Sequence, residues 1–212
     1  LSTGTNNAFP EMREPTIAAM AVALYATGKL KRASALGDNK VLEISINDGE
    51  RKDIAIVDAL ISPERFIGAR AIWKNDRLHS VFLTFADPQA IGFSAIGGLI
   101  EPTPRDSDSG LCVQLSTSAD DQAYVLQAPI APGFLSPVGI RACRSMPADE
   151  PHSVGLEAGV VALDGERELV FDEQDKVVVT QRKHAFKTVD IPSCMREAAA
   201  KGLYRHLLNN QH

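Results

Sequence analysis

The sequence predicts a mainly β protein of the β-sandwich type, with a helix near each end. Short apolar runs recur between residues 31 and 181, separated by glycine and proline and without long helical patterns between them. Many short strands in this arrangement indicate a sandwich or barrel and not a parallel α/β sheet. Apolar residues spaced three and four apart near both ends predict the flanking helices.

The first helix is expected directly after an opening loop over residues 1–12. Pro15 suits the first helical position, where its missing N–H costs nothing. Gly28 marks the end, because a residue without a Cβ adopts the left-handed cap conformation easily. The apolar stripe between these two positions consists of Ile17, Met20, Ala21 and Leu24.

The central region reads as a series of strands. Asn47-Asp48-Gly49 predicts a hairpin turn, because these residue types tolerate positive φ. An apolar run from Val41 to Ile46 precedes it and Ile54, Ile56 and Val57 follow it. Further strands are expected at 78–86, 110–116, 123–127, 137–144, 157–162, 167–171 and 176–181. For Phe66 to Trp73, periodicity does not decide between helix and strand.

A second helix is predicted to begin at Asp190-Ile191-Pro192 and to run to about Leu208. Its apolar stripe consists of Met195, Ala198, Ala199 and Leu203. Exposed apolar stripes drive association. We therefore expect this chain to self-associate as a homo-oligomer.

Composition narrows the classes of partner. The net charge of −5 and a pI near 5.5 argue against nucleic acid and anionic membrane as partners, but leave room for a small anionic ligand. No apolar run approaches the roughly 20 residues of a membrane span. Cys112, Cys143 and Cys194 form no C-x-x-C pair, which favours reduced thiols and a cytoplasmic protein.

The first candidate site is the loop Gly4, Thr5, Asn6 and Asn7. Glycine and asparagine favour tight turns that expose N–H groups, and such a loop before a helix can hold a ribose or phosphate oxygen. An Asx turn that caps the following helix explains the same residues equally well.

The second candidate is the stretch from Gly92 to Pro102, with Ser94, Gly97 and Gly98. Paired glycines allow the backbone to approach a ligand closely. The residues alone favour a simple glycine kink in a β-rich domain.

The third candidate is the Asp164-Gly165-Glu166 turn. Two carboxylates one residue apart can hold Mg²⁺ or accept a proton from an attacking hydroxyl, so Asp164 and Glu166 are candidates for both roles. The competing interpretation is an ordinary hairpin tip, for which Asp-Gly is a common turn.

Taken in order, four phrases resemble the acetoin-catabolism protein X family, of the NAD kinase and diacylglycerol kinase superfamily. The phrases are STGTNNAFPEMREPTIAAMAVALYATGKL, DIAIVDALISPERFIGARAIW, GFSAIGGLIEP and ALDGERE. They span nearly the whole chain. Within them, GTNNAF is similar to the lipid-kinase loop Gly-Thr-x-Asn-Asp-Phe, FSAIGG to the Ser-Ala-Gly-Gly of NAD kinases, and LDGE to the acidic motif of lipid kinases.

The resemblance implies an amino-terminal α/β domain, absent here, that holds nucleotide phosphates with a Gly-Gly-Asp-Gly motif. Residues 1–29 would then belong to the edge of that domain, residues 30–190 to a β-sandwich domain, and residues 191–212 to a helix that returns toward the absent domain. The implied reaction is phosphoryl transfer from ATP to a hydroxyl of NAD, with Mg²⁺ and the acids Asp164 and Glu166. These 212 residues alone are expected to be inactive.

Two rival functions stay open. One is a lipid or small-alcohol kinase on the same scaffold. The other is a nucleotide sensor without turnover, which is favoured by Ala8 in place of the family's aspartate and by the additional Ile96 in the Ser-Ala-Gly-Gly segment.

Overall fold

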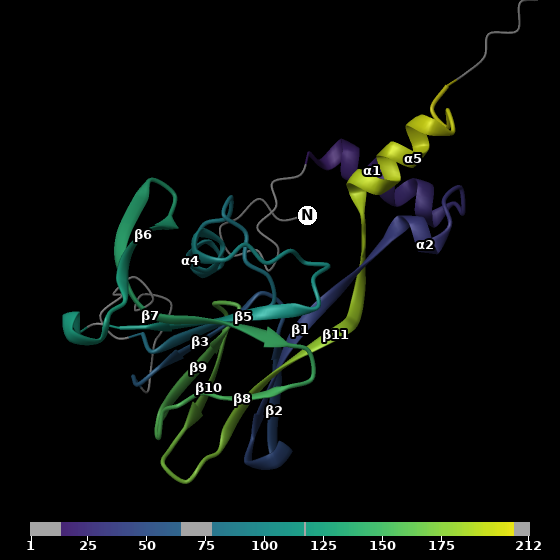
Figure 1. The fold of residues 1–212 in the computed structure, drawn as a ribbon. Helices are drawn as coiled ribbons and strands as arrows, with labels where there is room; N and C mark the ends of the chain where they lie inside the picture. Colours follow the sequence, from purple (N-terminus) through teal and green to yellow (C-terminus); the bar gives the residue numbers. More distant parts are fainter. Residues whose placement is uncertain (1–13, 65–77, 117, 206–212) are drawn as a thin grey trace, which may run out of the picture. The chain divides into compact units, whose positions relative to one another are not determined.

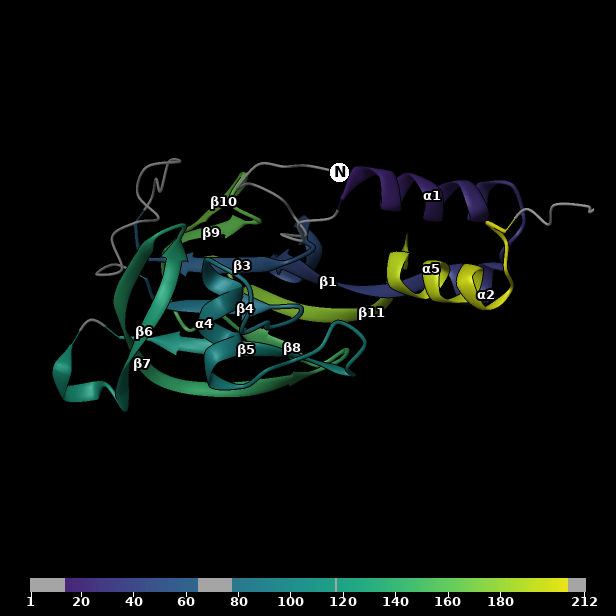
Figure 2. The same cartoon turned by 90° about the horizontal axis from the view of Figure 1, so that it is seen from above.

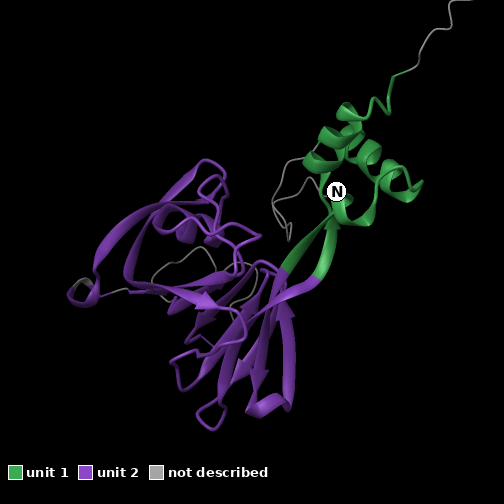
Figure 3. Cartoon of the chain, turned by 45° about the vertical axis from the view of Figure 1, so that its right-hand side comes forward, with its two compact units in different colours: residues 1–4, 11–39, 186–212 green, residues 5–10, 40–185 purple. Residues whose placement is uncertain are grey.

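The computed structural model describes residues 14–64, 78–116 and 118–205. The described chain divides into two compact units (Figure 3). The helical unit contains residues 14–39 and 186–205, and the β-rich unit contains residues 40–185. Two long strands, β1 (Leu36–Ile46) and β11 (Val177–Val189), contribute residues to both units.

The first helix of the helical unit, α1 (Pro15–Ala26), confirms the predicted bounds. The Glu14 carboxylate accepts a hydrogen bond of 2.9 Å from the N–H of Ile17, which caps the first turn. Gly28 follows the helix with a φ of 70°, a conformation that favours glycine.

The apolar stripes of the helical unit bury one another. Helix α1 packs against α5 (Ile191–Ala200), and the short helix α2 (Arg32–Ala35) contacts both. Their buried apolar residues are Ala21, Leu24, Leu30, Ala35, Cys194 and Ala198. The two stripes are therefore partly covered within the chain, and self-association stays a prediction. Ile17 and Val22 remain exposed on α1.

Helix α5 ends at Ala200, so the predicted extension to Leu208 is wrong for residues 201–205. Gly202 takes a φ of 64° and its N–H bonds to the carbonyl of Ala199, while the N–H of Leu203 reaches the carbonyl of Ala198. This pair of bonds closes the helix end in the manner of a Schellman motif.

The β-rich unit consists of two sheets, and the mainly β prediction is confirmed for the described residues (Figure 1). The four-stranded sheet has the order β2-β1-β11-β8, with β2 (Arg51–Ala55) and β8 (Pro151–Ser153). The seven-stranded sheet has the order β10-β9-β3-β4-β5-β7-β6. Its strands are β3 (Asp58–Ser62), β4 (Ser80–Leu83), β5 (Ser109–Leu115), β6 (Tyr124–Ala131), β7 (Phe134–Pro147), β9 (Gly159–Leu163) and β10 (Arg167–Phe171).

The central strands of the seven-stranded sheet are buried on both faces. Along β4, Val81 and Leu83 join one apolar cluster and Phe82 joins the other, because neighbouring side chains alternate across a strand. The cluster with Phe82 fills the space toward the four-stranded sheet. The cluster with Leu83 is covered by helix α4 (Phe93–Ile100), which lies over this sheet in Figure 2. Burial on both faces explains why β4 and β9 are apolar without alternation.

Two further details of the sequence prediction are wrong. The glycine-rich stretch at 93–100 is a helix between β4 and β5 and not a kink in a strand region, because Ile96 is fully buried in the apolar cluster and fixes the helical face. The apolar run after the Asn47–Gly49 turn is not one strand either. It leaves the four-stranded sheet after Ala55 and enters the seven-stranded sheet at Asp58.

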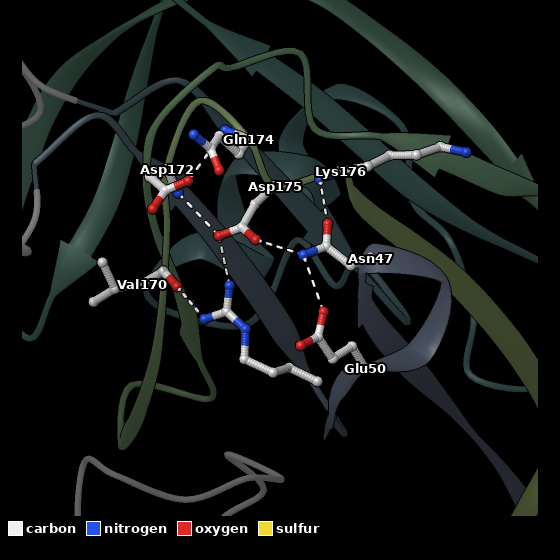
Figure 4. Close-up of polar contacts among 8 residues, drawn as sticks. Asn47, Glu50, Val170, Asp172, Gln174, Asp175 and Lys176 are labelled. Atoms are coloured by element: carbon white, nitrogen blue, oxygen red, sulfur yellow. Dashed lines mark hydrogen bonds and ion pairs between the residues drawn. The ribbon is translucent and has the colours of Figure 1, made fainter.

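A polar network joins two turns at one end of the sandwich (Figure 4). Asp175, in the turn before β11, accepts hydrogen bonds from Asn47 at 2.7 Å and from the N–H of Asp172 at 3.1 Å. Arg51 forms an ion pair with the same carboxylate at 2.5 Å and donates to the carbonyl of Val170. The network therefore ties the β1–β2 turn to the β10–β11 turn.

Candidate functional site

The predicted site residues fall into three groups in the structure. The first group lies outside the described residues and consists of Gly4, Thr5, Asn6 and Asn7, so their roles stay predictions. The stretch from Phe66 to Trp73, whose secondary structure the sequence does not decide, also lies outside the described residues. Ser94, Gly97 and Gly98 lie on α4. Asp164 and Glu166 lie in the turn between β9 and β10, which confirms the predicted hairpin tip.

The backbone of this turn is specified by its sequence. Asp164 and Gly165 have φ values of 51° and 70°. Aspartate and glycine tolerate this left-handed region better than most residues. The N–H of Glu166 donates to the carbonyl of Leu163 at 3.0 Å and closes the turn. Glu166 itself is exposed at the tip.

The side chain of Asp164 points away from the tip and holds the crossover between the two sheets. Its carboxylate accepts from the N–H groups of Ile56 at 2.9 Å, Val57 at 2.8 Å and Asp58 at 3.2 Å. The N–H of Asp164 donates in return to the carbonyl of Asp58 at 3.0 Å. We call this set of contacts the Asp164 clamp.

Thr84 completes the crossover from the other side. Its hydroxyl donates to the carbonyl of Ile56 at 2.8 Å, and its N–H donates to the carbonyl of Val57 at 3.0 Å. Thr84 is almost completely buried. The crossover would otherwise leave polar backbone groups without partners in the interior, which is costly.

Asp58 is the residue that sequence reasoning missed. Burial, and then the charge of Asp164, raise the pKa of its carboxyl from 3.8 to about 7. Among the described residues, no group donates a hydrogen bond to this carboxylate, and the side chain is only half-buried. The available signal was an acid placed at the head of an apolar run, where an unpaired charge is unfavourable.

Helix α4 contacts the chain directly after Thr84. The hydroxyl of Ser94 donates to the carbonyl of Phe85 at 3.4 Å. A Cβ on Gly97 would collide with Leu83, and one on Gly98 would collide with the backbone of Asp87. The two glycines therefore allow α4 to approach residues 83–88 closely, and a ligand contact at either glycine stays a prediction. The glycine-rich helix therefore contacts residues 83–88 directly, whereas the acidic turn is linked to Thr84 through Ile56 and Val57.

A buried lysine fixes the neighbouring loop. The ammonium of Lys40 donates to the carbonyl of Pro104 at 3.1 Å, to the hydroxyl of Ser107 at 3.0 Å and to the carbonyl of Ser109 at 2.7 Å. Burial lowers the pKa of Lys40 to about 8. The loop carries Arg105, whose guanidinium lies 4.1 Å from the centre of the Phe85 ring.

The Asp164 carboxylate is a poor choice for a metal ligand. Three N–H groups already engage it. In the part of the chain that the structure describes, no group of three or more His, Cys, Asp or Glu side chains is placed to hold a metal ion. We therefore derive no metal-dependent step from Asp164 and Glu166. None of the described helices is long and apolar enough to span a membrane.

Comparison with known proteins identifies similar sequences. The family model described as "Acetoin catabolism protein X C-terminal domain" matches residues 40–184, which is nearly the whole β-rich unit. A protein of Cupriavidus necator named "Acetoin catabolism protein X" is 51% identical over 210 residues. That alignment covers 98% of this chain and 58% of the relative, so the chain spans little more than half of the relative's length.

Proposed function

This chain belongs to the acetoin catabolism protein X family. On that premise we propose that it forms part of an ATP-dependent phosphotransferase linked to acetoin catabolism. The acceptor in this proposal is a hydroxyl of NAD or of a related small molecule. The proposal includes the fold, with the β-rich unit as the second domain of an NAD kinase-like protein.

The observation that carries the proposal is the carboxylate pair formed by Asp58 and Asp164. Phosphoryl transfer needs little covalent chemistry from a protein, but it needs fixed positions for donor and acceptor and a carboxylate near the attacking hydroxyl. The Asp164 clamp fixes the backbone of Asp58 by bonds at both its N–H and its carbonyl. A rigid, half-buried carboxylate suits this role.

The remaining predicted residues receive roles in the same proposal. Gly4, Thr5, Asn6 and Asn7 would contact the nucleotide. Ser94 lies in the first turn of α4, where Gly92 supplies no side-chain cap, so N–H groups of this turn can donate to a phosphate or ribose oxygen. Gly97 and Gly98 set the position of α4. Mg²⁺ would arrive with ATP, because this ion is commonly held largely by substrate phosphates and water.

The test is a transfer assay on the complete gene product that contains these 212 residues. ATP labelled at the γ-phosphate is offered with NAD, acetoin or diacylglycerol as acceptor. We expect ATP-dependent formation of NADP or of phosphorylated acetoin.

Each other outcome has a defined meaning. Labelled lipid would support the lipid kinase alternative. Binding of NAD by calorimetry without any transfer would support the sensor. A protein that neither transfers phosphate nor binds ATP or NAD contradicts all three.

A further inference from the structure

We propose that Asp58, and not Asp164, contacts the acceptor hydroxyl and accepts its proton, with Asp164 as the residue that positions it. This inference rests on the proposed phosphotransferase function. It differs from the roles that the sequence of the acidic turn suggests, in which Asp164 itself accepts the proton. Asp58 lies more than 100 residues before this turn in the chain.

The two carboxylates differ in what they already contact. Asp164 accepts from three backbone N–H groups, and these contacts leave it little freedom to engage a substrate. For Asp58, no described residue donates to the carboxylate oxygens. The residue as a whole is only half-buried. A substrate hydroxyl can therefore fill a hydrogen-bonding position that the protein leaves open.

The elements around Asp58 bring no compensating positive charge among the described residues. From β4, Leu83 lies opposite Asp58. On β9, Leu163 lies opposite Ala59, the residue after Asp58. On β2, Asp53 is already paired with Arg167 of β10. Burial, and then the charge of Asp164, raise the pKa of Asp58 to about 7. A carboxylate in this state accepts a proton effectively near neutral pH.

The acceptor oxygen forms a bond to the γ-phosphorus of ATP while the bond from that phosphorus to the β–γ bridging oxygen breaks. The electron pair of the broken bond leaves with ADP. The hydroxyl proton passes to the Asp58 carboxylate and then to solvent.

The test compares Asp58→Asn with the matched control Asp48→Asn in the complete gene product. Asp48 lies in the β1–β2 turn with its carboxylate 89% exposed. We expect D58N to lose at least about 100-fold in kcat, the usual scale for a general base. The Kd of D58N for ATP should differ from that of the wild type by less than about threefold. The Tm of D58N at pH 8 should be higher than that of the wild type. D48N should keep both kcat and Tm.

A merely structural Asp58 predicts a different result, namely a lower Tm at pH 8 together with the lower activity. That result overturns the inference, and so does a D58N protein with wild-type kcat. Wild-type kcat/KM should also rise with pH through about 7, and a flat profile contradicts the assignment. If the wild type transfers no phosphate, both the proposed function and the role of Asp58 are contradicted. If D58N is as active as the wild type, only the role of Asp58 is contradicted.

Discussion

Two turns of the β-rich unit each use an aspartate to connect segments that are distant in the sequence, but the two aspartates have different partners. In the turn before β11, Asp175 joins distant segments through Arg51, Asn47 and the N–H of Asp172. In the turn before β10, Asp164 joins distant segments through three N–H groups. The first carboxylate has a cationic partner. The second has none among the described residues, and a second carboxylate, Asp58, lies beside it.

The difference shows in the pKa values. The hydrogen bond from Arg51, followed by that from the N–H of Asp172, lowers the pKa of Asp175. Burial and the Asp164 charge raise the pKa of Asp58 to about 7. Asp175 therefore has the properties of a structural residue. The ionised form of Asp58, in contrast, is unfavourable in the folded protein, and no contact among the described residues compensates for this. Uncompensated costs of this kind are concentrated at functional sites.

Asp164→Ala should give the largest loss of stability. It removes the acceptor for three N–H groups of the crossover, and buried unpaired groups cost about 1 to 3 kcal/mol each. We expect a loss of about 3 kcal/mol, since water can reach part of the turn. Urea unfolding at pH 5.5 measures this best, because Asp58 is then protonated and its repulsion with Asp164 is absent.

Asp164→Gly separates the clamp from the backbone conformation. Glycine accepts the φ of 51° without strain but provides no carboxylate. Both variants should lose similar stability if the clamp is the main contribution. A glycine variant as stable as wild type would show that the conformation of the turn, and not the clamp, is what Asp164 supplies.

Asp58→Asn should change stability in the opposite direction, and only at higher pH. The native pKa is raised from 3.8 to about 7, so the native state binds more protons than the unfolded state between these values. Wild-type stability therefore falls as pH rises from about 4 to 7 and then levels off, by up to about 4 kcal/mol. D58N lacks this pH dependence, because its side chain does not ionise.

The measurement is the difference in unfolding free energy between D58N and wild type from pH 5 to pH 8. The advantage of D58N should grow steadily with pH and stop growing above about 7.5. An advantage that is the same at every pH would mean that neither burial nor the charge of Asp164 raises the pKa of Asp58.

Asp175→Asn should have a smaller effect. Asparagine keeps an acceptor for Asn47 or for the N–H of Asp172, but it removes the ion pair with the half-exposed Arg51. We expect a Tm lower by only about 2 to 4 °C. Because salt screens exposed pairs, the difference should shrink in 1 M NaCl. A difference that is unaffected by salt would place its origin in the hydrogen bonds alone.

Much of the fold was predictable because it depends on local patterns. Pro15 and Gly28 mark the first helix, and Asn47-Asp48-Gly49 and Asp164-Gly165 mark turns, through conformational preferences that do not need the rest of the chain. The helix at 93–100 was not predictable in this way. Two glycines disfavour a helix locally, and its stability depends on packing against β4, β5 and β6.

The candidate site was predictable only in part. The Asp164 turn is evident from Asp-Gly, but the direction of its side chain is not, because the partners lie at residues 56–58. Asp58 looks like any acid before an apolar run. Its importance arises from the contact with the turn of Asp164, which is set by the pairing of β3 with β9.

Glu166→Gln gives the smallest expected change in stability and the sharpest test of the assignment by sequence. Glu166 is exposed at the tip of the turn, so its replacement should change the unfolding free energy by less than about 0.5 kcal/mol. The informative readout is kcat. If Asp58 accepts the proton, E166Q should keep kcat within about tenfold of wild type while D58N does not, since only the latter removes a general base. A loss in E166Q as large as that in D58N would show that the acidic tip takes part in transfer, as the sequence motif predicts, and that Asp58 does not act alone.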